Sequence, residues 1–232
     1  MPMLCYSFRF GICGQTAVMS KIFPISMLLL LLALAPATWA EGAVWKLSKG
    51  DNYLYIGGTI HLLSKQDYPL PDAYERAYQD AGKIVFEIDL ANTDAAMTRE
   101  EVFAKGMYTD GGSLATHMQP ATLDKLRAFT EARGIPLEGL MPYKVGMVLT
   151  ILTVAELQRS GITGKGVDQY FQARATADNK STDALESVGK QIDILASLGE
   201  GDDDASVLAK IKELESVGED FIRLRTAWRA GD

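Results

Sequence analysis

Residues 53–63 read Tyr53-Leu54-Tyr55-Ile56-Gly57-Gly58-Thr59-Ile60-His61-Leu62-Leu63. The run is β-prone at its start, and the pair Gly57 and Gly58 lets the backbone turn tightly shortly before His61. His61 is one of only two histidines in the chain. A histidine just past the end of a strand is suited to bind a metal ion or to transfer a proton near neutral pH.

A second strand-like run, Lys83 to Leu90, contains two acidic residues. Because side chains alternate along a strand, we expect Glu87 and Asp89 on one face and the apolar residues on the other. The residues alone leave two interpretations open. In the first, His61 and these carboxylates form the first half of a metal or acid–base site. In the second, His61 is a hydrogen-bonded histidine at a strand end, and the carboxylates form a solvated face.

The first forty residues have the pattern of a secretory leader. Lys21, the apolar run Met27 to Ala35 and the segment ending at Ala40 correspond to its three regions, so we predict cleavage after Ala40 and a true start at Met19. The alternative is an uncleaved membrane anchor, although the apolar run is shorter than the roughly 20 residues that a spanning helix needs. Residues 41–232 then form the mature domain.

The full chain of 232 residues, with 47% hydrophobic and 23% charged residues, has the composition of a globular protein of one domain, with or without a small appendage. Removing the leader takes away Arg9 and Lys21, so the net charge moves from −7 to −9. This acidity argues against a nucleic-acid partner, which requires clustered basic residues. The only cysteines, Cys5 and Cys13, lie in the leader, so we expect no disulfide and no thiol chemistry.

Periodicity predicts an α/β fold with an α+β tendency. A hairpin formed by residues 43–48 and 53–56 and a strand around Val85 form a small strand layer, joined by a helix over 71–81. A further strand is expected at 182–186, with Glu186 at its end. The remainder is mostly helical, with helices over residues 94–105, 121–133, 143–159, 167–177, 187–198 and 203–230. The last carries an apolar stripe, Val207, Ile211, Leu214, Phe221, Leu224 and Trp228, that needs a partner.

The sequence shows no other catalytic motif. The mature chain contains no cysteine and no Gly-x-Ser-x-Gly elbow, and the segment Gly161–Gly166 lacks the Gly-Lys-Ser/Thr ending of a phosphate loop. We interpret that segment as a loop that opens the helix at Val167. His117 follows a glycine-containing loop and is interpreted as an ordinary surface residue.

Five segments of the chain form a recognisable series. They are Gly57-Gly58-Thr59-Ile60-His61, Phe86-Glu87-Ile88-Asp89-Leu90, Gly164-Lys165-Gly166-Val167-Asp168-Gln169-Tyr170-Phe171, Ala184-Leu185-Glu186 with Gln191, and Ala227-Trp228-Arg229-Ala230-Gly231-Asp232. In this order the segments resemble the TraB/PrgY/GumN family, relatives of the Tiki metalloproteases, over nearly all of residues 43–232.

The resemblance implies a divalent-metal site for peptide hydrolysis. Gly58 and His61 match the family's first Gly-x-x-His motif, Glu87 matches the strand acid, and Glu186 matches a later glutamate of less clear role. His61 and Glu87 are thereby implied as ligands of manganese, cobalt or zinc, and Glu87 or Glu186 as a general base. Family members carry a second Gly-x-x-His motif after the segment that ends here at Asp232. We therefore expect a C-terminally truncated member whose metal site is incomplete.

The resemblance also leaves a second function open, a non-catalytic periplasmic module that binds or sequesters its ligand in pheromone control or polysaccharide export. The leader predicts a periplasmic or extracellular location, or membrane association if it is not cleaved. The amphipathic final helix would favour a homo-oligomer if its apolar stripe were exposed.

Overall fold

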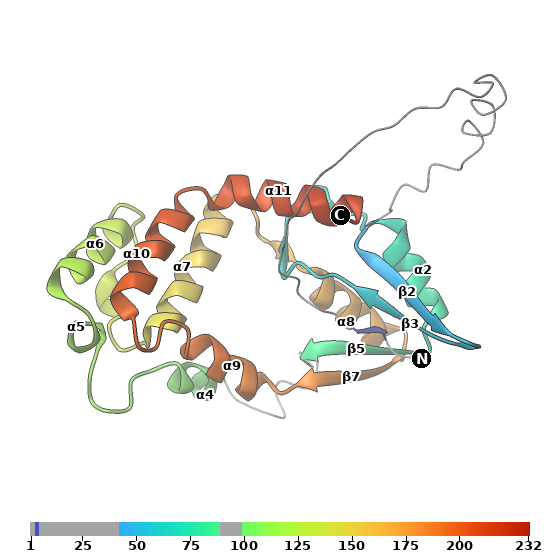
Figure 1. Ribbon diagram of the computed structural model, residues 1–232, viewed down its shortest axis with the longest axis horizontal. Coiled ribbons are helices and arrows are strands. Elements are labelled where there is room, and N and C mark those ends of the chain that lie inside the picture. Colours follow the sequence, from blue (N-terminus) through green and yellow to red (C-terminus); the bar gives the residue numbers. More distant parts are fainter. Residues whose placement is uncertain (1–2, 5–41, 89–98) are drawn as a thin grey trace, which may run out of the picture.

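The computed structural model describes residues 3–4, 42–88 and 99–232, and it shows a mixed α/β protein, as predicted (Figure 1). Strands β2, β3, β5 and β7 lie at one end with helices α2 and α8. Helices α5, α6, α7 and α10 lie at the other end. Apart from Met3 and Leu4, the predicted leader lies outside the described residues, as does Asp89. Among the residues that the structure describes, no helix is long and apolar enough to cross a membrane.

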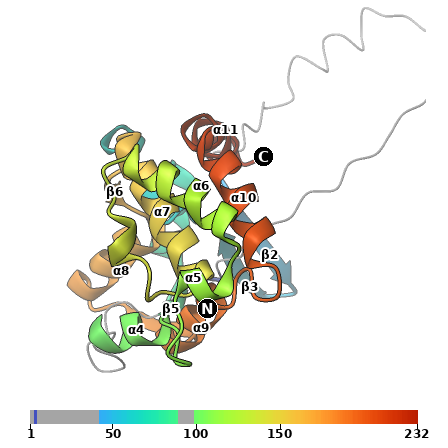
Figure 2. The ribbon, with the colours of Figure 1, turned by 90° about the vertical axis from the view of Figure 1, so that its left-hand side faces the viewer.

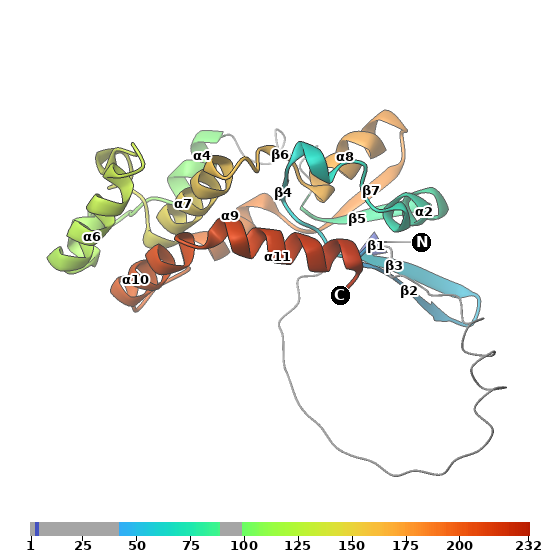
Figure 3. The same cartoon turned by 90° about the horizontal axis from the view of Figure 1, so that it is seen from above.

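The predicted hairpin is confirmed and projects from the body of the protein (Figure 3). Strands β2 (Val44–Lys49) and β3 (Asn52–Gly57) pair antiparallel. The connection is only two residues long, and Gly50 adopts a φ of 59° there. Such tight hairpin turns need a left-handed residue, and glycine takes that conformation without steric cost. The short strand β1 (Met3–Leu4) pairs parallel with the other edge of β3.

The strand that carries Glu87 lies in a second, two-stranded sheet. Strands β5 (Lys83–Ile88) and β7 (Ser181–Glu186) pair parallel, with Ile88 opposite Glu186. Helix α2 (Asp72–Asp80) leads into β5, and helix α8 (Val167–Ala177) leads into β7, as the strand–helix–strand pattern predicted. Ile84 and Phe86 are buried, and Glu87 is only partly buried, so the predicted division of the two strand faces is confirmed for these residues.

A third pair of strands was not predicted. Strands β4 (Leu62–Leu63) and β6 (Gly164–Lys165) pair antiparallel just after His61, and η1 (Lys65–Asp67) follows β4. Each strand is only two residues long, which is too short for an alternation pattern to appear in the sequence. Gly166 forms the N-cap of α8, as the loop interpretation of this segment predicted.

The helical end contains the apolar helix α7 (Val145–Arg159), which packs against α9 (Val188–Ala196), and it also contains α6 (Pro120–Glu131). The short helices α4 (Arg99–Lys105), α5 (Leu114–His117) and η2 (Leu137–Gly139) complete it. Figure 2 shows α6, α7 and α10 packed together at this end. Val148 and Leu152 are completely or almost completely buried, so α7 is the buried helix that the sequence predicted.

One prediction was wrong: residues 203–230 do not form a single helix. Helix α10 (Asp203–Leu214) ends, and α11 (Val217–Ala230) begins after a break at Glu215 and Ser216. The break lets α10 pack on α6 and α7 while α11 runs across to the strand end (Figures 1 and 3). The apolar stripe is therefore divided between two cores, and most of it is buried. Leu224 is the exception, with 56% of its surface exposed.

Candidate metal and acid–base site

The backbone before His61 is fixed by two aromatic side chains from distant helices. The carbonyl oxygen of Gly58 accepts hydrogen bonds from the Tyr74 hydroxyl at 2.5 Å and from Trp228 Nε1 at 2.9 Å. Tyr74 and Trp228 are buried, and they belong to α2 and α11. Because buried hydrogen bonds hold a group in one place, these contacts fix where the Gly58–His61 segment leaves the hairpin.

The backbone of His61 is in close contact with the start of α8. The amide of Val167 donates to the carbonyl oxygen of Ile60 at 3.0 Å. A side-chain carbon on Gly166 would lie 2.4 Å from the carbonyl carbon of His61, so glycine is required there for the two chain segments to approach. This packing places Asp168, in the first turn of α8, beside the His61 ring.

The His61 ring lies between two carboxylates. Its Nε2 atom is 3.5 Å from Glu87 Oε2, and its Nδ1 atom is 3.3 Å from Asp168 Oδ2. The His61 side chain is 64% exposed, the Glu87 side chain 35% and the Asp168 side chain 15%. Two nitrogens of one imidazole thus face two acids, and Glu87 is the more exposed of these acids.

Asp168 is the more deeply buried of the two acids that face His61. Its Oδ1 atom is buried and has no hydrogen-bond partner among the described residues. An unpaired buried oxygen of this kind has a desolvation cost of about 1–3 kcal/mol, which favours any arrangement that brings a donor to Asp168. The interaction with Asp168, and more weakly the charge of Glu87, raises the pKa of His61 above its ordinary value, against the opposing effect of burial.

The two carboxylates and His61 line a cavity of about 190 Å³. Gln169 and Gln191 also line it, together with Ile88. Glu186 is not among the lining residues. In the parallel register it pairs with Ile88, so by strand alternation it shares the face of Ile88 rather than that of Glu87. The structure therefore brings His61 and Glu87 together and places Glu186 at the end of the neighbouring strand.

The donors around His61 fit a divalent cation in part. Two ligands of a tetrahedral zinc ion lie about 3.4 Å apart, given metal–ligand distances of about 2.0–2.2 Å. The 3.5 Å between His61 Nε2 and Glu87 Oε2 matches that separation. Asp168 behind the ring corresponds to the carboxylate that commonly orients a metal-binding histidine. Within residues 42–88 and 99–232, however, no group of three or more His, Cys, Asp or Glu residues is arranged to hold a metal ion.

His117 lies apart from this site. Its ring stacks on Tyr108, and its Nε2 atom is 3.1 Å from Asp110 Oδ2. It lines a separate cavity and none of the surface around His61. The sequence interpretation of His117 as an ordinary surface residue left out these contacts.

Fold and site together define a mixed α/β protein with a histidine–carboxylate cavity between a strand end and a helix start. The family model described as the TraB/PrgY/gumN family matches residues 43–232, so the chain belongs to this family. The resemblance stated from the sequence motifs is thereby confirmed. Comparison with curated proteins and with solved structures found no match.

The raised pKa of His61 gives a testable pH dependence. In the metal-free chain, NMR titration of the His61 ring should yield a pKa above 6.5, and Asp168→Asn should return it toward that value. Because the folded protein binds the His61 proton more tightly, this stabilisation is complete below pH 6.5 and disappears as the pH rises through the raised pKa. The ring of His117 serves as the internal reference. An unchanged His61 titration in Asp168→Asn would show that Asp168 does not interact with the ring.

Proposed function

We propose that this chain is a divalent-metal-dependent hydrolase of peptides or peptide-like substrates, whose described residues supply part of the metal site. The observation that carries the proposal is the orientation of His61. Asp168 lies beside Nδ1, while Nε2 faces the more exposed Glu87 carboxylate. An imidazole oriented in this way presents the lone pair of Nε2 to an ion that Glu87 can share.

His61 and Glu87 would hold the cation, and Asp168 acts as a positioning residue. A carboxylate beside Nδ1 favours the tautomer that carries its proton there, which keeps Nε2 free to bind. The buried side chain of Asp168 is fixed in the first turn of α8 and prevents the ring from turning. When bound, a divalent cation polarises a carbonyl group and lowers the pKa of a coordinated water.

The remaining steps belong to polar groups near the cavity. Glu87 and Glu186 are the candidates for the base that takes a proton from the attacking water. Glu87 lines the cavity, whereas Glu186 lies at the end of β7. The side chains of Gln169 and Gln191 carry neutral donors and acceptors. They suit an uncharged peptide group, which itself presents one donor and one acceptor.

The proposal includes export of the chain, to the periplasm or the outside of the cell. It rests on the leader pattern of residues 1–40 and on the absence of cysteine from the mature sequence, which makes folding independent of the redox state of the compartment. The alternative function, a module that binds its ligand without chemistry, would use the same cavity.

Metal titration by calorimetry tests the proposal. Manganese, cobalt and zinc are added to the purified protein and to its variants. We expect binding in the unchanged protein, loss of binding in His61→Ala and Glu87→Ala, and about 10- to 100-fold weaker binding in Asp168→Asn. His117→Ala is the matched control, because it removes the other histidine, and it should leave the affinity unchanged.

The hydrolase and the binding module are distinguished by activity. Metal-dependent cleavage of a peptide library that is lost in His61→Ala would support the hydrolase. Peptide binding that is unaffected by His61→Ala, with no cleavage at any metal concentration, would favour the module. Absence of metal binding in the unchanged protein would contradict the proposed metal site.

A further inference from the structure

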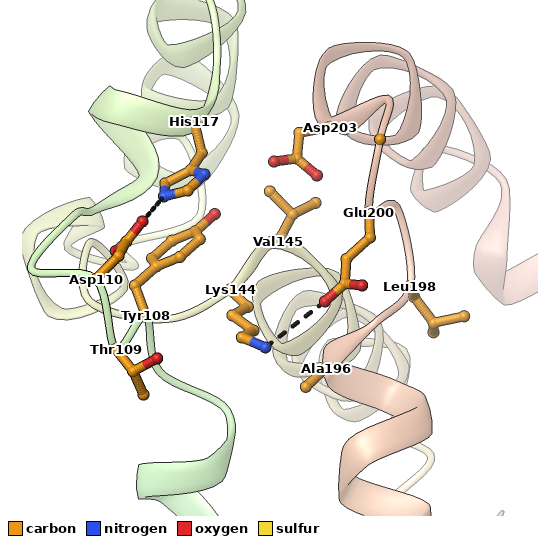
Figure 4. Close-up of a pocket in the computed structure, with 11 residues that line it drawn as sticks. Tyr108, Thr109, Asp110, His117, Lys144, Val145, Ala196, Leu198, Glu200 and Asp203 are labelled. Atoms are coloured by element: carbon orange, nitrogen blue, oxygen red, sulfur yellow. Dashed lines mark hydrogen bonds and ion pairs between the residues drawn. The ribbon is translucent and has the colours of Figure 1, made fainter.

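A second, larger cavity lies at the helical end of the protein. It has a volume of about 320 Å³ and is formed where α7 begins, beside α5 and the loop between α9 and α10 (Figure 4). None of its lining residues lines the cavity around His61. This cavity is therefore separate from the candidate metal site.

One wall of this cavity is a stacked pair of rings. The rings of Tyr108 and His117 lie 3.9 Å apart between centroids and are within 7° of parallel. Asp110 Oδ2 lies 3.1 Å from His117 Nε2. A side-chain carbon on Gly112 would approach that nitrogen within 2.9 Å. Asp110 and Gly112 thus hold the stack on its His117 side, and the stack presents an aromatic surface.

Two polar groups at the cavity lack a hydrogen-bond partner among the described residues. The Tyr108 hydroxyl is buried and makes no hydrogen bond within the part of the chain that the structure describes. The Asp203 carboxylate makes neither a hydrogen bond nor an ion pair with any described residue. Figure 4 shows the Tyr108 hydroxyl pointing toward the side of the cavity that Asp203 occupies. A ligand that donates a hydrogen bond to the buried Tyr108 hydroxyl oxygen would remove the desolvation cost of that oxygen, and it can also donate to the partly exposed Asp203 carboxylate.

The charges around the cavity favour a cation. Lys144 Nζ is 3.6 Å from Glu200 Oε1, and His117 is paired with Asp110, so both basic side chains already have acidic partners. Asp203 forms no ion pair with a described residue, and only the nearby charge of His117 partly offsets its own. Burial raises the pKa of Asp203, the charge of His117 opposes this effect, and the nearby charges of Asp204 and Glu200 raise the pKa further. A bound positive charge would reverse this effect.

An organic cation suits this cavity better than a metal ion. No described group of three or more His, Cys, Asp or Glu residues could hold a metal. The cavity also has an apolar part, where Val145 and Ala196 are 2% and 3% exposed. The ring of Tyr108 lines the cavity, and aromatic rings attract ammonium groups. Burial raises the pKa of the Tyr108 hydroxyl to about 12, so this group remains neutral and can accept a hydrogen bond.

We propose that this cavity binds a primary ammonium group carried on a short aliphatic chain. The ammonium donates hydrogen bonds to the Asp203 carboxylate and to the Tyr108 hydroxyl oxygen, and the aliphatic chain lies against Val145 and Ala196. This inference is independent of the proposed hydrolase, since it uses no residue of the His61 site.

Three four-carbon compounds that differ in the charge of their polar group test this proposal. Binding of n-butylammonium, 1-butanol and butyrate to the full chain is followed by NMR, through the signals of His117 and Val145. We expect only n-butylammonium to shift these signals in a saturable way, and the signals of His61 to stay in place. Affinity should fall about tenfold in Asp203→Asn and in Tyr108→Phe, the effect of losing one charge-assisted hydrogen bond.

Asp124→Asn is the matched control, because it makes the same change on an exposed residue of α6 and should leave binding unchanged. Equal binding of 1-butanol or butyrate would overturn the inference, as would n-butylammonium binding that both variants leave intact. Displacement of the probe by calcium at the same signals would identify a metal site instead. If Asp203→Asn does not fold, Tyr108→Phe provides the test, because it removes only the hydroxyl.

Discussion

Gly166→Ala should destabilise the protein and disturb the His61 site together. The added carbon would lie 2.4 Å from the His61 carbonyl carbon and oxygen and 2.5 Å from its Cα atom. These are backbone atoms that cannot rotate away. The backbone of Gly166 has φ −75° and ψ 174°, a conformation that alanine readily adopts, so the cost is steric. We expect a loss of about 1–3 kcal/mol or more in the free energy of unfolding.

The measurement for Gly166→Ala is urea unfolding combined with NMR of the His61 ring. Gly139→Ala is the control, because no atom lies within 4 Å of the position that its new carbon would take. That control should change stability by less than about 0.5 kcal/mol. If Gly166→Ala left both the stability and the His61 signals unchanged, the contact between α8 and the His61 backbone would be loose enough to accept a methyl group.

Trp228→Ala should produce the largest loss of stability among the substitutions considered. Trp228 is 5% exposed, and its Nε1 atom donates to the Gly58 carbonyl oxygen at 2.9 Å and lies 2.6 Å from the Tyr74 hydroxyl. Replacing a buried tryptophan by alanine typically costs about 3–5 kcal/mol. The released Gly58 carbonyl should also shift the amide signals of residues 58–61, measured by NMR on the folded fraction.

Trp228→Phe separates the two contributions of Trp228. It keeps an aromatic ring in the core and removes the Nε1 donor, so we expect a smaller loss of about 1–3 kcal/mol. Leu224→Ala on the same helix is the control, because Leu224 is exposed and should contribute little. If Trp228→Phe matched Trp228→Ala in both stability and amide shifts, the hydrogen bond rather than the packing would hold α11 in place.

The parts of the fold that follow from local patterns were predictable. The hairpin, the helix before β5, the strand at Ser181–Glu186 and the buried helix α7 each carry a periodicity within their own residues. The break between α10 and α11 has a local signal too. Ser216 and Glu219 are spaced as in the capping box that opens many helices. The apolar stripe continues on both sides of this signal and favours a single helix, so the break was not predicted.

The candidate site was predictable in part. His61 and Glu87 stand out because each follows or lies in a strand pattern. Asp168 does not stand out in the sequence, because a helix start with one acidic residue is common on any protein surface. It does lie in one of the segments on which the family resemblance rests. Its role depends on the packing of α8 against the backbone of His61, a contact between distant parts of the chain that no local pattern encodes. Tyr74 and Trp228 were missed as supports of Gly58 for the same reason.

Helix α11 belongs to both cores of the protein. Val217 at its start packs with the apolar residues of the helical end, whereas Phe221 and Trp228 lie in the core beneath the strands. The two ends of the molecule therefore cannot separate without breaking this helix or exposing one of its faces. The protein should unfold as a single cooperative unit, and hydrogen exchange should slow at both ends when a ligand binds at either one.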